Sequence, residues 1–157
     1  MKKILSAGFW RGFTLVEIVI VVAIIGVLVA LGTPNFLRIK MNANEEVVRS
    51  DLRAFCTANE SSRSFSVPPI YAENIPSLID GGFLDSTWLN PGNKHGYVFT
   101  YRRNALGTSY SLEAGPLIEG VTGAKFYCLD ATGVIVIGSA SGLGTEAGCV
   151  GGIPLGG

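Results

Sequence analysis

The chain has 157 residues, of which 48% are hydrophobic and only 15% are charged, so its composition excludes an intrinsically disordered protein and fits one modest domain. Twelve basic side chains balance twelve acidic ones, which leaves no large net charge to attract nucleic acid or an acidic surface. The charges are unevenly distributed: three lie in residues 1–12, one in residues 13–37 and the other twenty in residues 38–157. This uneven distribution is the first indication of function.

The first two segments of the chain look like a cytoplasmic leader and a membrane span. Lys2, Lys3 and Arg11 are the only charged residues in residues 1–12, as in a stretch that keeps an N-terminus in the cytoplasm. Residues 13–33 contain one ionisable group, and a helix of that length crosses about 30 Å of hydrocarbon. A cleaved secretory signal peptide is the alternative, but its apolar region is shorter and ends in a small-residue site, which this run lacks. We therefore expect a transmembrane helix.

Glu17 is the one ionisable residue of the apolar run and lies one helical turn from its start. An acidic side chain at mid-membrane costs about 2.5–3.5 kcal/mol on insertion scales, so a plain anchor gains nothing from it. The alternative is that Glu17 lies near the interface and extends toward water. A chain cut between Gly12 and Phe13 would instead begin with an α-amino group about 6 Å of helix rise from Glu17. A neighbouring subunit displaced by about one turn would bring such an amine to this carboxylate.

Residues 11–17, RGFTLVE, continue into an uninterrupted apolar helix, and this stretch resembles the class III leader junction of type IV pilins and type II secretion pseudopilins. The resemblance implies that prepilin peptidase, an aspartic protease of the inner membrane, cuts after Gly12 and then N-methylates Phe13. It also implies that Glu17 recruits each subunit into a filament through the N-terminal amine of a neighbour. The resemblance is strong over residues 8–40 and rests on architecture alone beyond them.

The helix is expected to break where it leaves the membrane and then to continue into the head. Gly26 and Pro34 fall where type IVa pilins commonly have a glycine and a proline. With Gly32, Pro34 is expected to kink the helix or melt one turn, because proline lacks an amide donor and disfavours α geometry before it. Residues 34–66 are then expected to form an amphipathic helix whose apolar positions recur at spacings of three and four: Val48, Leu52, Phe55 and Cys56.

Residues 67–157 are expected to form a β-rich head with a glycine-rich C-terminal tail. Val67, Pro68 and Pro69 end the long helix, and a short helix over residues 77–84 is capped by Gly81. Aromatic and β-branched runs then predict four strands of an antiparallel sheet, over residues 97–101, 109–113, 124–129 and 134–137. A turn is predicted at residues 130–133, between the last two strands. The predicted fold class is α+β: a long N-terminal helix, first transmembrane and then amphipathic, packed on a small antiparallel sheet as in type IV pilins.

The tail from residue 138 to residue 157 has eight glycines and little to bury, so it needs a tether. A bridge between Cys128 and Cys149 would close a loop of about 22 residues and contribute about 3 kcal/mol in the chain-entropy model. Such a loop resembles the C-terminal disulfide region of many type IVa pilins. Pairs that include Cys56 remain open, because an export-facing domain favours a disulfide without choosing its partners.

Neither a catalytic site nor a metal or cofactor site is predicted. His95, the only histidine, lies in a turn-like stretch, and the sequence has no cluster of cysteines or carboxylates at metal-ligand spacing. No nucleophile elbow accompanies it to make a catalytic triad. The short run of residues 142–144, GLG, follows the strands and is too short for a phosphate loop.

Two further motifs favour ordinary surface roles. Residues 59–61, Asn-Glu-Ser, match a glycosylation sequon but lie within the predicted helix. A small set of basic and aromatic residues has a composition that could bind DNA: Lys94, Arg102, Arg103, Tyr97 and Tyr101. Three charges attract nucleic acid only weakly, so we expect solvated charges at the edge of the sheet and no nucleic-acid site.

These features together predict a non-enzymatic structural subunit that is held in the inner membrane by a single span, with its head outside the cytoplasm, and then polymerised into a helical homo-oligomeric filament outside the cell or in the periplasm. The resemblance implies two further partners, an inner-membrane platform protein and an assembly ATPase. The main alternative is a pseudopilin of a type II secretion system. A weaker alternative is a membrane-anchored periplasmic binding module or enzyme that keeps residues 1–12.

Overall fold

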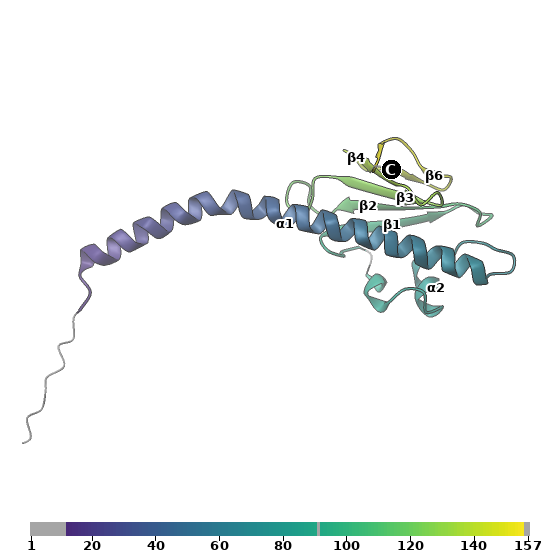
Figure 1. Cartoon of the computed structure of the whole chain (residues 1–157), viewed down its shortest axis with the longest axis horizontal. Coiled ribbons are helices and arrows are strands. Elements are labelled where there is room, and N and C mark those ends of the chain that lie inside the picture. The colour runs from purple at the N-terminus through teal and green to yellow at the C-terminus, as the bar shows by residue number, and fades with distance from the viewer. Residues whose placement is uncertain (1–11, 91, 156–157) are drawn as a thin grey trace, which may run out of the picture. The chain divides into compact units, whose positions relative to one another are not determined.

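The computed structural model describes residues 12–90 and 92–155, without the side chains of residues 31–34. It contains the helix α1 over Leu15–Phe65, the short helix α2 over Ile75–Asp80 and the 3-10 turn η1 over Ser86–Leu89 (Figure 1). The strands are β1 (Tyr97–Arg103), β2 (Tyr110–Pro116), β3 (Phe126–Asp130), β4 (Ile135–Gly138), β5 (Gly144–Thr145), β6 (Gly148–Cys149) and β7 (Ile153–Pro154). Internal contacts divide the chain after Phe36, and we call the compact unit that begins at Leu37 the head.

In the head, the C-terminal part of α1 packs on a five-stranded antiparallel sheet in the order β1-β2-β3-β4-β7 (Figure 1). β5 and β6 form a separate two-stranded ribbon within the tail. This architecture confirms the predicted α+β fold class. The two-residue strands of the tail and η1 were not predicted, because segments so short carry no periodic signal.

The core lies between α1 and the sheet. The side chains of Val48, Leu52 and Phe55 are completely buried, which confirms the expected apolar face of the helix. Their spacing of three and four residues repeats on one side because the helix has 3.6 residues per turn. Opposite them lie mainly aromatic and leucine side chains of the sheet and of the segment before it: Tyr71, Leu78, Trp88, Tyr97, Phe99, Tyr110, Leu112, Tyr127 and Leu129.

The melted turn expected where the helix leaves the membrane is not present, while the alternative, a kink at Pro34, stays a prediction. α1 is a single helix that continues through Gly26, Gly32 and Pro34. Proline removes its own amide donor and crowds the carbonyl group four residues earlier, but the 51-residue helix continues on both sides of it. The helix ends instead at Phe65, close to the predicted end, where Val67 and Pro68 follow.

Side-chain caps explain where the other short elements begin. The Asn74 side chain accepts a hydrogen bond from the Ser77 amide at 2.9 Å, so α2 begins two residues before its predicted start. It ends at Gly81, as expected. The predicted turn before β4 is confirmed, because the Gly133 amide donates to the Asp130 carbonyl oxygen at 3.0 Å.

Burial affects the titration of all five tyrosines. Burial, together with the nearby carboxylate of Glu60, raises the pKa of Tyr71 to about 12, and burial beside Glu45 raises the pKa of Tyr127 to about 12. Burial also raises the pKa values of the other three tyrosines, which are Tyr97, Tyr101 and Tyr110. The neutral phenol is therefore favoured in the folded state.

We therefore expect alkaline unfolding to coincide with tyrosine ionisation. A raised folded-state pKa contributes stability that is fully present below the unfolded pKa of about 10 and is lost as the pH rises toward about 12. In ultraviolet titration of the protein in detergent, tyrosinate absorbance at pH 10 should be near zero for the folded chain and near half of its maximum for the urea-unfolded chain. Half-maximal tyrosinate in the folded chain at pH 10 would contradict the burial of these rings.

Candidate functional site

The start of α1 is built around a threonine cap. The Thr14 hydroxyl oxygen accepts a hydrogen bond from the Glu17 amide at 3.2 Å, and the Thr14 carbonyl accepts from the Ile18 amide at 3.3 Å. Thr14 therefore occupies the N-cap position and Glu17 the third position of the helix. The pattern Thr-x-x-Glu is that of a capping box, so this helix start is already indicated by the sequence.

Glu17 has a local electrostatic advantage at this position. A carboxylate in the first helical turn lies near the unpaired amides of the helix N-terminus, which is worth about 0.3–1 kcal/mol at an exposed site. The Thr14 hydroxyl bonds to the backbone amide of Glu17 and leaves its carboxylate available. The arrangement therefore combines a fixed helix start with a negative side chain that can accept a cation.

The apolar side chains that follow are exposed in the isolated chain. Every large one between Phe13 and Leu28 has between 48% and 80% of its surface exposed. α1 is also the one helix among the described residues that is long and apolar enough to cross a membrane, by length and composition. A Cβ atom at Gly26 would meet no atom of the chain within 4 Å, so nothing within the subunit requires a glycine there. A helix that is apolar all round requires lipid or other protein around it.

The tail is fastened to the sheet by a disulfide and by two carboxylates. Cys128 and Cys149 form a disulfide, which confirms the predicted pair, and Cys56 is a half-buried free thiol. Glu113, itself buried, accepts hydrogen bonds from the amides of Gly142 at 2.7 Å and Gly144 at 3.1 Å. These contacts give a glycine-rich segment a defined path across the sheet without a large apolar surface of its own.

Asp130 holds the tail next to the disulfide. Its Oδ2 accepts from the Cys149 amide at 2.9 Å, and its Oδ1 accepts from the Thr132 hydroxyl at 2.6 Å and amide at 2.9 Å. Burial raises the pKa of Asp130, but these hydrogen bonds outweigh burial and hold the pKa below its usual value. The charged carboxylate therefore stabilises the folded tail.

The structure does not assemble the small basic patch considered for nucleic acid. The Lys94 ammonium lies 2.9 Å from Asp51 Oδ1 and over the Trp88 ring, with little exposed surface. Arg102 pairs with Glu113 at 3.3 Å. The ring of Tyr97 is completely buried, so it offers no face for a base to stack on.

The remaining candidates also have structural roles. His95 Nε2 lies 3.7 Å from Asp51 Oδ2, and the described residues contain no group of three potential metal ligands. The Asn59 side chain is completely buried, accepts from the Ala72 amide at 3.2 Å and lies 3.5 Å from the Tyr101 hydroxyl. The sequon asparagine is therefore not a surface acceptor for glycan in the folded head.

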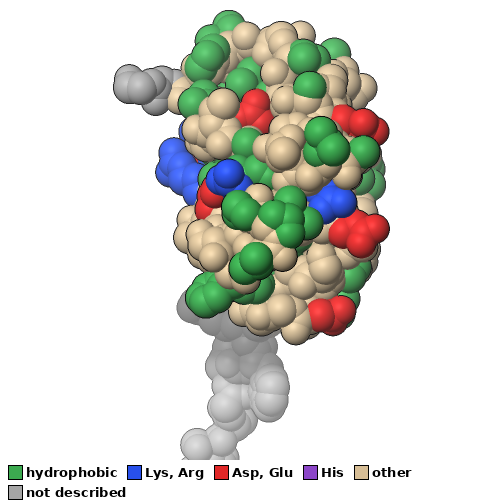
Figure 2. All heavy atoms as spheres, turned by 90° about the vertical axis from the view of Figure 1, so that its right-hand side faces the viewer, with side chains coloured by type: hydrophobic (Ala, Val, Ile, Leu, Met, Phe, Trp, Pro, Cys, Tyr) green, Lys and Arg blue, Asp and Glu red, His purple; other side chains and the backbone are tan. Residues whose placement is uncertain are grey.

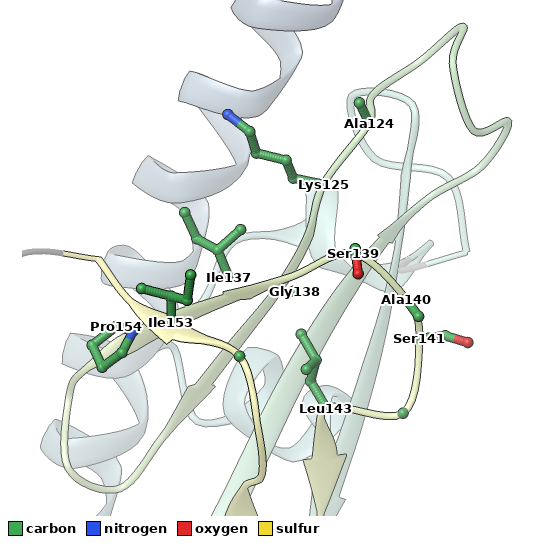
Figure 3. Close-up of a pocket in the computed structure, with 12 residues that line it drawn as sticks. Ala124, Lys125, Ile137, Gly138, Ser139, Ala140, Ser141, Leu143, Ile153 and Pro154 are labelled. Carbon is green, nitrogen blue, oxygen red and sulfur yellow. The ribbon is translucent and has the colours of Figure 1, made fainter.

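An open groove of about 620 Å³ lies beside β4, between the start of β3 and the tail (Figure 3). Most of its wall is apolar or glycine, and Lys125 is its only charged lining residue. Lys125 extends toward α1, where its ammonium lies 3.3 Å from Glu45 Oε2. Ser139 and Ser141 line the groove, but no lining residue can act as a general base beside them. The lining therefore offers no arrangement for nucleophilic catalysis.

Comparison with known proteins identifies the family of this chain. Residues 11–33 match the family model described as the prokaryotic N-terminal methylation motif. The chain is 30% identical over 106 residues to the Type IV narrow pilus major component PilA5 of Thermus thermophilus, and the match covers 66% of this chain and 81% of that protein. The chain belongs to the type IV pilin and type II secretion pseudopilin family.

Two other relatives represent both branches of this family. The chain is 33% identical over 103 residues to the Type II secretion system core protein G of Escherichia coli, with 65% of this chain and 70% of that protein covered. It is 37% identical over 87 residues to the Type IV major pilin protein PilA of Myxococcus xanthus, with 55% of this chain covered. That match spans only 36% of the length of the Myxococcus protein. No solved structure matches the chain significantly.

Replacing Asp130 should loosen the tail of this pilin-family head. In Asp130→Asn the side-chain nitrogen that replaces one carboxylate oxygen cannot accept a hydrogen bond, and loss of one such bond costs roughly 1 kcal/mol. We expect hydrogen exchange at the Cys149 amide to become about fivefold faster, as measured by mass spectrometry. Asp85→Asn is the matched control, because Asp85 caps η1 through Thr87.

The same contact should depend on pH. Because the pKa of folded Asp130 is lowered, its contribution is present above the unfolded pKa of about 4 and is lost as the pH falls through the folded value. Protection of the Cys149 amide in the wild-type chain should therefore decrease below about pH 4, after correction for the intrinsic exchange rate, while Asp130→Asn should show no such step. An identical pH profile in both chains would remove this role.

Proposed function

We propose that the chain is a structural subunit of a type IV pilus filament, processed by prepilin peptidase and polymerised through the N-terminal part of α1. The observation that carries the proposal is an exposed, wholly apolar helical segment whose single charge, Glu17, lies in the first turn. The match of residues 11–33 to the methylation motif supports the same assignment. The head then supplies the outer surface of the filament.

Cleavage between Gly12 and Phe13 would convert a membrane precursor into an assembly-competent subunit. It removes Lys2, Lys3 and Arg11, so the formal side-chain charge falls from zero to 9 − 12 = −3. It also creates an α-amino group on Phe13, which is then N-methylated and remains cationic. The Thr14 cap fits this cut, because the helix begins after the new N-terminus and the cap uses no atom of residues 1–12.

In the filament, the Phe13 amine of one subunit would pair with the Glu17 carboxylate of a neighbour displaced along the axis. The apolar face would exchange lipid contacts for contacts with neighbouring helices, which leaves a small net driving force because both environments are apolar. A buried ion pair then fixes the axial register of the subunits. The side chains that this exchange would bury are Val16, Ile18 to Ile25 and Val27 to Ala30, and the expected burial of Leu31 lies outside the described side chains.

The proposed setting is the inner membrane before assembly, with the head outside the cytoplasm, and an extracellular or periplasmic filament afterwards. The disulfide between Cys128 and Cys149 supports a head in an oxidising compartment. Prepilin peptidase, a platform protein and an assembly ATPase are the proposed partners. We assign the chain no enzymatic activity, cofactor or nucleic-acid partner.

The second candidate function is a pseudopilin of a type II secretion system, which would form a short periplasmic piston. The similarity to protein G over 70% of its length favours this candidate specifically. Electron microscopy of the medium and of sheared cells separates the two functions. Fibres that carry this chain and disappear on deletion of its gene support the pilus, while loss of a secreted protein without loss of fibres supports the secretion system.

Intact-mass analysis of membrane and sheared-filament fractions tests the processing step. We expect the chain to lack residues 1–12 and to carry one added methyl group on Phe13, because the peptidase couples both reactions in the proposed mechanism. A Gly12→Leu chain serves as the control and should keep all 157 residues in the membrane. An intact Met1 in the wild-type chain, with none of it in a fibre fraction, would refute the proposal.

Removing the charge of Glu17 should reduce assembly and leave processing intact. In Glu17→Gln the side chain keeps its size but loses its negative charge and cannot form an ion pair with an amine, and loss of one partner of a buried charge pair costs about 2 kcal/mol or more. We expect at least a tenfold lower ratio of filament to membrane protein, by quantitative immunoblotting of sheared fractions. Glu17→Ala should behave similarly.

Thr14→Val separates this assembly role from a role in starting the helix. It removes the hydroxyl that caps α1 and leaves the Glu17 carboxylate in place. We expect its incorporation to remain within about threefold of wild type. If Thr14→Val fails as completely as Glu17→Gln, or if Glu17→Gln assembles normally, Glu17 has no separate part in recruiting subunits.

A further inference from the structure

The end of the head where α1 stops exposes a mixture of hydrophobic, basic and acidic side chains (Figure 2). Such a mixed surface indicates no partner of one charge or one polarity. The feature that the proposed function leaves unexplained lies below the surface instead. It is the free thiol of Cys56, next to a buried hydroxyl, that of Tyr110, which has no hydrogen-bond partner among the described residues.

The hydroxyl of Tyr110 is the exception among the tyrosines of the chain. The other four donate a hydrogen bond from the hydroxyl to an oxygen atom: Tyr71 to the Glu60 carboxylate, Tyr97 to the Lys125 carbonyl, Tyr101 to the Ala72 carbonyl and Tyr127 to the Glu45 carboxylate. The Tyr110 side chain is completely buried, yet its Oη lacks such an acceptor in the described part of the chain. A buried donor without an acceptor destabilises a fold, so this hydroxyl requires an explanation.

The strand register and the turn after β3 bring this hydroxyl and the Cys56 thiol together. Ser111 of β2 pairs with Asp130 of β3, so Tyr110 lies beside the turn that follows Asp130. Cys56 faces the same turn, because a Cβ atom added to Gly133 would lie 3.9 Å from Cys56 Sγ. Burial, followed by the contact with the Cys56 thiol, raises the pKa of Tyr110. Sulfur is a weak acceptor, so the thiol does not satisfy the hydroxyl.

The thiol of Cys56 is partly open to solvent. Its side chain is neither buried nor fully exposed, and Gly133 places no side chain over the sulfur. Gly133 has a φ of 75°, a conformation that favours glycine, so the turn itself keeps a side chain away from the thiol. The other two cysteines, Cys128 and Cys149, are joined to each other, which leaves no second thiol in the chain to pair with Cys56.

We propose that Cys56 is a site of reversible oxidation by a peroxide, at which the Tyr110 hydroxyl donates a hydrogen bond to the oxygen atom that the sulfur gains. The O–O bond of hydrogen peroxide breaks and an S–O bond forms, so the thiol becomes a sulfenic acid and water is released. The sulfur loses two electrons, and the peroxide gains them. Oxygen is a better acceptor than sulfur, so the oxidised side chain gives Tyr110 the partner that it lacks in the reduced chain.

The surroundings of Cys56 favour a sulfenic acid that persists. A sulfenic acid condenses readily with a nearby thiol, and the chain has no other free thiol. Two molecules of an external thiol would return Cys56 to its reduced form and leave their own disulfide and water. A head outside the cytoplasm is away from the thiols that keep cytosolic cysteines reduced, which prolongs the oxidised form. This chemistry goes beyond filament assembly and does not depend on it.

Trapping with dimedone, a carbon nucleophile that reacts with sulfenic acids, tests the proposal in the full chain solubilised in detergent. After treatment with hydrogen peroxide, mass spectrometry of the digested protein should find the dimedone adduct on Cys56. Cys56→Ser should give no adduct. An adduct in the urea-unfolded chain but none in the folded chain would show that the fold closes the thiol to peroxide, and would overturn the proposal.

Tyr110→Phe tests the part played by the hydroxyl, because it keeps the ring in the core and removes only the donor. In its reduced form this variant should unfold at the wild-type temperature or above it, since no ordinary hydrogen bond is lost. After peroxide treatment, its sulfenic acid should disappear about fivefold faster than that of the wild type as sulfinic acid forms. Tyr97→Phe is the matched control, because its hydroxyl donates to the Lys125 carbonyl oxygen, and it should keep the wild-type lifetime.

Two results with these chains would contradict the proposal. Equal lifetimes of the sulfenic acid in the wild type and in Tyr110→Phe would remove the part assigned to Tyr110. Conversion of wild-type Cys56 to sulfinic acid without a trapped sulfenic acid would overturn the reversible step. Both measurements use the solubilised subunit, so either result leaves the proposed filament function intact, while absence of fibres would overturn that function and leave the oxidation site standing.

Discussion

The part of α1 up to Leu28 carries no charge except that of Glu17 and has no water-compatible face, and this constraint governs where the subunit can be placed. Its large side chains are exposed in the isolated chain, and burying one of that size away from water is worth about 1.5–3 kcal/mol. A dozen such side chains make a free monomer in water far less stable than one in lipid or in an assembly. Assembly is then an exchange between two apolar environments, so the hydrophobic effect cannot by itself choose the register of one subunit against another.

The head is stabilised differently, because much of its C-terminal part is glycine, which has no apolar side chain to bury. Three carboxylates bind loop amides instead: Glu45 accepts from Ala124, Glu113 from two tail glycines and Asp130 from Cys149. A charged acceptor makes stronger hydrogen bonds than a neutral one, so a few of these contacts order a segment with little apolar surface. The disulfide at Cys149 adds a covalent limit at the same place.

The main helix and the four longer strands were predictable because each rests on a local pattern, while the sequence favoured the pair of Cys128 and Cys149 and left pairs with Cys56 open. The path of the tail was not predictable, since the buried Glu113 that holds it is a polar residue that a hydropathy pattern assigns to solvent. Of the two outcomes expected at Pro34, the melted turn was wrong, because the helical turns on either side of the proline continue when one amide donor is lost. At the candidate site, Glu17 was identified by its cost in an apolar run, while the Thr14 cap was missed although its Thr-x-x-Glu pattern is present in the sequence.

The position of Glu17 determines how much of the cost of burying its charge must be offset by another group. A carboxylate at mid-membrane costs about 2.5–3.5 kcal/mol, and the amides of the first turn return about 0.3–1 kcal/mol. The difference, about 2 kcal/mol, would destabilise every subunit whose Glu17 becomes buried without a cation. In the proposed mechanism, an amine exposed by cleavage would be absent from the precursor and present in every mature copy, so it would offset this cost only after processing and only between copies. The same carboxylate would therefore disfavour premature packing and fix the register of mature subunits.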